Sequence, residues 1–150
     1  MVINSRTMKR ILYLITIAIL MASCGDKQTG PQEEQLSLED KLIGQWHSTT
    51  LTVKGNIYLS FVESGKTFEL YQQIGEGAYR LYRGKWNLEE DLLTGRYNDG
   101  EEWHAAYTIS IENGTLTMTS RNDAAEKSVF EGCEIPTNVK ENCITIVKSY

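Results

Sequence analysis

Eight short stretches of alternating apolar and polar residues follow one another between residues 44 and 134, and turn signals separate them. We expect strands over residues 44–53, 57–63, 67–73, 79–87, 92–98, 102–111, 115–120 and 127–134. Asp99-Gly100 and Asn113-Gly114 favour tight hairpins, since both central residues of a primed turn need a positive φ. No helix-length segment separates the stretches, which excludes a parallel βαβ sheet. The strands should pair sequentially and antiparallel, with no parallel pair anywhere.

One face of the predicted sheet is apolar and the other is polar. Ile57, Leu59 and Phe61 share a face of the second strand, whereas Glu69 and Arg83 lie on the opposite face of its neighbours. Such a sheet curls, and eight strands leave two exposed edges unless the sheet closes. The predicted fold class is therefore all-β, an eight-stranded antiparallel up-and-down barrel. A two-sheet sandwich is the alternative, but its crossover connection is not visible in the sequence.

The first strand is the least regular. Trp46 shares its face with small polar residues, and the apolar residues Leu51 and Val53 lie opposite. A bulge near Ser48 would reconcile the two halves of this strand. We expect Trp46 and Trp86 to lie inside the barrel.

The N-terminal residues have the order of a bacterial lipoprotein signal. Arg6, Lys9 and Arg10 precede an apolar run over residues 11–21, and Met21-Ala22-Ser23-Cys24 closes it. The run is shorter than the roughly 20 apolar residues that a spanning helix needs. An ordinary cleaved signal is the other alternative. We expect cleavage before Cys24 and a lipid anchor, with palmitate, on this cysteine. An aspartate directly after the lipidated cysteine would favour retention at the inner membrane, and this chain has Gly25 there. We therefore expect the protein on the outer membrane of a Gram-negative bacterium, where it would face the periplasm or the cell surface.

The expected organisation is a signal peptide over residues 1–23, a polar flexible tether over 24–36, a barrel domain over 37–138 and a tail over 139–150. Three of the 15 basic residues and none of the 20 acidic residues lie in the signal, so the mature chain carries a formal charge of −8. This charge excludes nucleic acid as a partner, because phosphates demand a positive surface. Membrane attachment would depend on the lipid anchor.

Several short motifs resemble the lipocalin-like lipoproteins of Bacteroidetes. They are Gly44-Gln45-Trp46 after a capped turn at Ser37–Asp40, Gly84-Lys85-Trp86-Asn87-Leu88, Leu93-Thr94-Gly95-Arg96-Tyr97 and Glu134-Ile135-Pro136. The resemblance covers about residues 40–138. It implies a small barrel on a lipid anchor, in which Trp46 closes one end and any ligand enters at the other.

The sequence contains no recognisable catalytic motif, and we expect the protein not to be an enzyme. A nucleophile elbow and a phosphate-binding loop are both missing. His47 and His104 each follow a tryptophan and should point away from it into solvent. We therefore expect surface histidines, no metal site and no cofactor.

Lipidation of Cys24 would leave Cys133 and Cys143 as the two cysteines with free thiols. Two thiols in an oxidising compartment predict one disulfide, which would pin the tail to the last strand. Two buried free thiols are the alternative.

An eight-stranded barrel is either filled by its own side chains or wide enough for one small ligand. The predicted ligand-binding residues for an apolar or aromatic ligand are Trp46, Leu59, Phe61, Phe68, Leu70, Tyr82, Trp86 and Tyr107. The alternative is a packed barrel that binds an envelope protein, as an inhibitor or accessory subunit. Exposed tyrosines, such as Tyr71, Tyr79 and Tyr97, would then form the contact surface.

Overall fold

The computed structural model describes residues 36–50 and 55–147. The predicted signal, Cys24, the tether up to residue 35 and residues 51–53 of the predicted first strand lie outside the described residues. The elements are helices α2 (Leu38–Leu42) and α3 (Thr137–Glu141), the short 3-10 helix η1 (Ser64–Lys66), and nine strands: β1 (Gly44–Ser48), β2 (Gly55–Val62), β3 (Thr67–Ile74), β4 (Tyr79–Glu89), β5 (Leu92–Tyr97), β6 (Tyr107–Glu112), β7 (Thr115–Ser120), β8 (Lys127–Gly132) and β9 (Cys143–Thr145).

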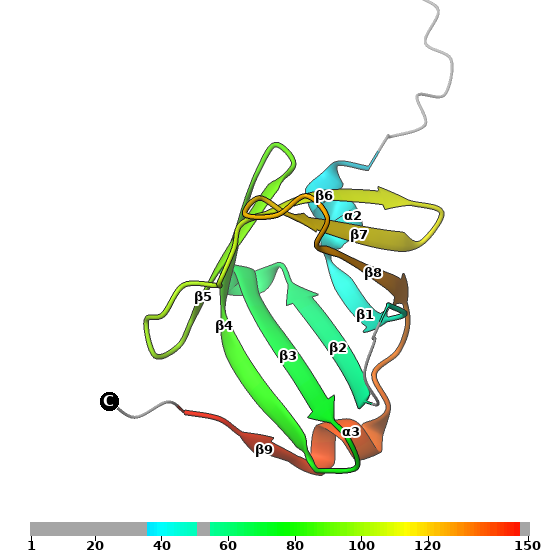
Figure 1. Cartoon of the computed structure of the whole chain (residues 1–150), viewed down its shortest axis with the longest axis vertical. Coiled ribbons are helices and arrows are strands. Elements are labelled where there is room, and N and C mark those ends of the chain that lie inside the picture. Colours follow the sequence, from blue (N-terminus) through cyan, green and yellow to red (C-terminus); the bar gives the residue numbers. More distant parts are fainter. Residues whose placement is uncertain (1–35, 51–54, 148–150) are drawn as a thin grey trace, which may run out of the picture. The chain divides into compact units, whose positions relative to one another are not determined.

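The first eight strands form a closed antiparallel barrel, which confirms the predicted fold class (Figure 1). Each strand pairs with the next, and β1 pairs with β8 through Trp46 opposite Gly132. The hairpin between β6 and β7 turns at Asn113 and Gly114, whose φ angles are 50° and 76°. Both are positive, as expected for a primed turn.

β9 pairs with β4 in parallel, Tyr79 lying opposite Cys143. The expectation that no strand pair would be parallel is therefore wrong. The cause lies in β4, which pairs with β5 only from Gly84 onward and so leaves one edge of residues 79–81 open. The chain reaches this edge after α3 and runs along it in the direction of β4 (Figure 1). Backbone N–H and C=O groups that would otherwise need water are satisfied in this way.

Buried aromatic side chains fill one end of the barrel. Phe61 and Trp86 are almost fully buried there, and their rings meet edge to face at 5.9 Å. Trp46 is 5% exposed, so both tryptophans lie inside as predicted. Helix α2 covers this end and places Leu42 in the same core. Its first turn is held by a capping box, in which Ser37 and Asp40 each accept a hydrogen bond from the other's backbone N–H.

A second apolar cluster lies on the outer face of the barrel wall. This outer cluster consists of Tyr71, Leu81, Ile135 and Val139, and Tyr58, Tyr79, Cys133 and Cys143 pack against it. Tyr71 and Leu81 are cross-strand partners on β3 and β4, and α3 contributes Val139. The segment after β8 therefore covers a part of the sheet that the alternation assigned to solvent. Tyr71 was expected to be exposed and is only 3% exposed.

Cys133 and Cys143 are free thiols in the structure, and both lie half-buried against the outer cluster. The Cys143 thiol donates a hydrogen bond to the Lys140 carbonyl at 3.3 Å. Burial raises the pKa of the Cys133 thiol, and the positive charge of Lys140 lowers it by a smaller amount. The disulfide stays a prediction for the oxidised protein. In the described residues, no helix has the length and apolar character needed to span a bilayer.

Candidate functional site

The connection between β5 and β6 shapes the other end of the barrel. We expected a strand over residues 102–111, but β6 begins only at Tyr107. The preceding residues turn back at Asp99-Gly100 and pair with β5 instead, through a bridge from Arg96 to Glu102. The Trp103 N–H donates to the Gly95 carbonyl at 2.8 Å. Residues 98–106 are therefore a folded connection, in which strand alternation does not apply.

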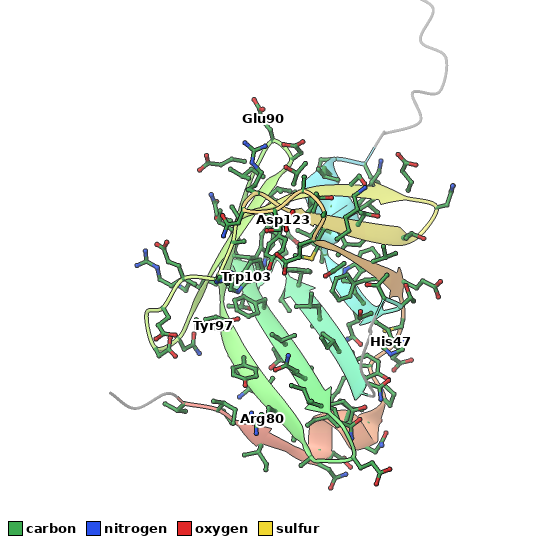
Figure 2. All side chains as sticks on the ribbon, in the orientation of Figure 1. His47, Arg80, Glu90, Tyr97, Trp103 and Asp123 are labelled. Atoms are coloured by element: carbon green, nitrogen blue, oxygen red, sulfur yellow. The ribbon has the colours of Figure 1, made fainter. Side chains whose placement is uncertain are left out.

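This connection places the Trp103 side chain against the aromatic core. Its ring lies 5.0 Å from Phe68 and 6.1 Å from Tyr107, edge to face in both cases. Gly95 makes room for it, because a Cβ atom there would overlap the Trp103 indole. Figure 2 shows Trp103 and Tyr97 near each other beside β4 and β5, and both rings contact Phe68. Four aromatic residues thus gather at this end of the barrel.

A cavity of about 190 Å³ opens among them. Its lining comes from β2, β3, β5, β6, β7, β8 and the 98–106 connection. The lining residues are Ile57, Leu59, Phe68, Leu70, Tyr97, Trp103, His104, Tyr107, Met118, Ser128 and Phe130. We call this space the mouth cavity. Helix α2 lies beside Trp46, whose indole contacts Leu42. The entry of a ligand away from Trp46 stays a prediction.

The structure divides the eight predicted ligand-binding residues into two groups. Leu59, Phe68, Leu70 and Tyr107 line the mouth cavity. Trp46, Phe61 and Trp86 do not line it, since they are packed at the covered end. Tyr82 lies beside the cavity and contacts Tyr97 with a ring separation of 6.0 Å. The role of all eight in binding a ligand stays a prediction.

The residues at the covered end are held by polar contacts that leave them little freedom. The Trp86 indole N–H donates to the Thr67 carbonyl at 3.1 Å. Lys66 lies over the Trp86 ring, 5.2 Å from its centroid, and pairs with Glu39 of α2 at 3.0 Å. These contacts tie the helix, η1 and the barrel together at this end.

Sequence reasoning missed Trp103, His104, Ser128, Phe130 and Tyr97 as lining residues. The alternation predicts Tyr97 as an exposed contact residue and Trp103 as a member of a regular strand. One signal was available for Trp103. Gly95 interrupts the inward face of β5, and a glycine within a strand often marks the close approach of another group.

The polar groups of the mouth cavity are few. His104 and Ser128 contribute polar side chains, and Tyr97 and Tyr107 contribute hydroxyl groups. The pKa of Tyr107 is raised mainly by burial and, to a smaller extent, by the nearby Glu126 carboxylate. The phenol therefore stays protonated at neutral pH and is able to donate a hydrogen bond. A mostly apolar lining with a few polar groups is the usual composition of a small-molecule site.

The two histidines lie in different surroundings. His47 lies on the outside of the barrel, where its ring stacks on Tyr58 at 4.5 Å and its Nε2 is 3.2 Å from Asn56 Oδ1. His104 was expected to face solvent and is exposed, but it also lines the mouth cavity. Residues 36–50 and 55–147 contain no group of three histidine, cysteine or acidic side chains able to hold a metal ion.

Comparison with known proteins agrees with this architecture. No curated protein matches the chain. A family model described as a lipocalin-like domain matches residues 42–134. The matched segment contains all eight barrel strands and every residue that lines the mouth cavity. The chain therefore belongs to the lipocalin-like domain family.

Proposed function

We propose that this protein binds a small apolar or aromatic molecule in the mouth cavity. The observation that carries this proposal is the cavity itself, because nine of its eleven lining residues are apolar or aromatic, and they come from six strands and Trp103. Its 190 Å³ compares with an engineered apolar cavity of about 150 Å³ that binds benzene. A ligand of one or two fused rings fits this space. His104 and Ser128 would orient a polar substituent.

A lipid anchor in the cell envelope is the second part of the proposal. It is supported by the order of the basic residues, the apolar run and Met21-Ala22-Ser23-Cys24. The acidic chain gives no electrostatic attraction to anionic lipid, so attachment would depend on Cys24. An anchored binding protein would hold its ligand close to the membrane.

The alternative role as a protein-binding module has less support. That role requires exposed tyrosines as the contact surface and a barrel filled by its own side chains. Tyr71 is buried in the outer cluster, and Tyr97 lines the mouth cavity. The ligand-binding role therefore agrees better with the positions of these side chains.

Calorimetric titration with 2-naphthol tests the binding proposal. Leu70→Trp would fill the cavity and should abolish binding. Ser110→Trp is the matched control, since it adds the same side chain on the exposed face of β6. We expect wild type and the control to bind equally. Absence of binding by wild type, or equal binding by Leu70→Trp, contradicts the proposal.

Metabolic labelling with palmitate tests the anchor. The wild-type protein should be labelled and recovered with membranes, and Cys24→Ala should be neither. Cys133→Ala is the control for a general effect of removing a cysteine. Equal labelling of wild type and Cys24→Ala would exclude lipidation at this residue.

A further inference from the structure

A second hollow lies next to the mouth cavity, and one residue lines both. It has a volume of about 430 Å³, and five of its ten lining residues are polar or charged. Its lining residues are Lys85, Trp86, Asn87, Thr94, Gly95, Arg96, Glu102, Trp103, Ala105 and Ala106. We call it the side hollow. Trp103 alone belongs to the linings of both spaces.

The barrel wall is weakest where these two spaces meet. β5 and β6 are joined through only two residue pairs, Leu92 with Thr108 and Leu93 with Tyr107. By comparison, β6 and β7 are joined through six. Beyond Leu93, β5 pairs with residues 101–103, so its continuation is separated from β6. The described part of the barrel thus has a seam here, which the Trp103 side chain fills.

The backbone on either side of the seam is fixed. The Trp103 backbone N–H donates a hydrogen bond to the Gly95 carbonyl. The Arg121 backbone N–H donates a hydrogen bond to the Ala106 carbonyl at 2.9 Å. The Asn122 side chain donates to the His104 carbonyl at 3.0 Å. Movement at the seam is therefore movement of the half-buried Trp103 side chain rather than of the loop. The side hollow offers the space into which an indole can rotate.

We propose that the Trp103 side chain is a movable partition between the mouth cavity and the side hollow, and that it sets the length of ligand that the barrel accepts. With the indole in place, a ligand of two fused rings occupies the mouth cavity alone. A longer ligand requires the indole to rotate away, so that the ligand extends through the seam toward Lys85 and Arg96. This inference rests on the proposed ligand-binding function.

The first test needs no ligand. The chain contains three tryptophans, so 5-fluorotryptophan labelling gives three fluorine resonances, and Trp103→Phe identifies the one from Trp103. Gly95→Ala pushes a methyl group into the space of the indole. We expect the Trp103 resonance to shift most and to show a larger change between H₂O and D₂O, as exposed fluorine does, and the resonance of the more distant Trp46 to stay unchanged. Gly77→Ala is the matched control, because the nearest atom to its Cβ is 3.8 Å away.

The second test compares 2-naphthol with the longer N-phenyl-2-naphthylamine, which carries a phenylamino group in place of the hydroxyl. Wild type should bind the longer molecule at least about tenfold more weakly than 2-naphthol, in the range that pocket size alone discriminates. Trp103→Ala should remove this difference by improving the binding of the longer molecule.

Three results would overturn the partition. They are an unchanged Trp103 resonance in Gly95→Ala, equal disturbance of all three tryptophans in that variant, and unchanged discrimination in Trp103→Ala. If neither molecule binds any variant, the proposed function fails, while the fluorine measurement still decides whether the Trp103 side chain moves.

Discussion

The indole N–H of Trp46 donates a hydrogen bond of 3.0 Å to the backbone carbonyl of Leu42. Both residues are buried, and the bond joins the end of α2 to the first strand of the barrel. It satisfies one of the carbonyl groups that the end of a helix leaves without a partner. The capping helix and the barrel are thus connected by a side chain that is itself part of the core.

Trp46→Phe should lower the free energy of unfolding by about 1–3 kcal/mol, because a buried carbonyl loses its donor. Urea unfolding measures this change. The urea dependence of the free energy should stay the same, which separates lost stability from a change in the unfolded chain. A loss below about 0.5 kcal/mol, the range of ordinary surface substitutions, would contradict the importance of this bond.

Gly84→Ala should destabilise the barrel by about 2–3 kcal/mol, as overpacking of a core does. A Cβ atom there would overlap the Arg96 carbonyl oxygen, which belongs to the backbone of β5, and would also meet the Phe68 ring. Thermal unfolding followed by circular dichroism measures the loss. Gly77→Ala in the β3–β4 turn is the control and should change stability by less than about 0.5 kcal/mol. Equal stability of the two variants would contradict the close approach of β4 and β5.

Ile135→Ala should cost about 2–4 kcal/mol, since this side chain is 2% exposed within the outer cluster. Ile144→Ala removes the same atoms from a side chain that is 58% exposed, and should cost less than about 0.5 kcal/mol. Chemical unfolding of both variants tests whether the segment after β8 is part of the folded core. Similar losses in the two variants would argue against the outer cluster.

Tyr71→Phe should reduce the sensitivity of the protein to alkaline pH. Burial and the hydrogen bond that the Tyr71 hydroxyl donates to Glu69 at 2.7 Å raise the pKa of this phenol above its ordinary value of 10.0. The folded protein therefore holds this proton more tightly than the unfolded chain does. The resulting stability is complete below about pH 10 and is lost as the pH rises further.

Melting temperatures of wild type and Tyr71→Phe between pH 8 and pH 11 test this expectation. Wild type should lose stability more steeply above about pH 10. Glu69 keeps its ion pair with Arg83 at 2.8 Å in the variant, so the comparison isolates the phenol. Parallel curves would mean that Tyr71 does not contribute to the alkaline transition.

The barrel was predictable because its signals are local. Ile57, Leu59 and Phe61 recur with a period of two, and Asn113-Gly114 adopts the positive φ angles that its turn requires. A slip of one residue in β2 would move three large side chains into water, so burial enforces the register. The limits of the eight strands follow the predicted ones closely, except in β1 and at the start of β6.

The mouth cavity and the outer cluster were less predictable because they depend on contacts between distant segments. Trp103 and Ala105 alternate like strand residues, and only the pairing of Glu102 back onto Arg96 takes them out of β6. Tyr71 has the outward phase of its strand, and its burial depends on Ile135 and Val139, more than 60 residues later. Alternation reports the face of a strand but not what covers that face.

Pairing of β1 with β8 and of β4 with β9 has a consequence for the order in which the chain can fold. The hairpins from β2 to β7 can form as soon as their residues leave the ribosome, since their partners are adjacent. Closure has to wait for Lys127–Gly132, and the edge of β4 stays open until Cys143–Thr145 has been synthesised. Contacts between such distant residues slow folding. The segment from Lys127 to Thr145 therefore decides when the sheet closes, and a chain cut short within it would keep its hairpins and leave an open sheet with unpaired edges.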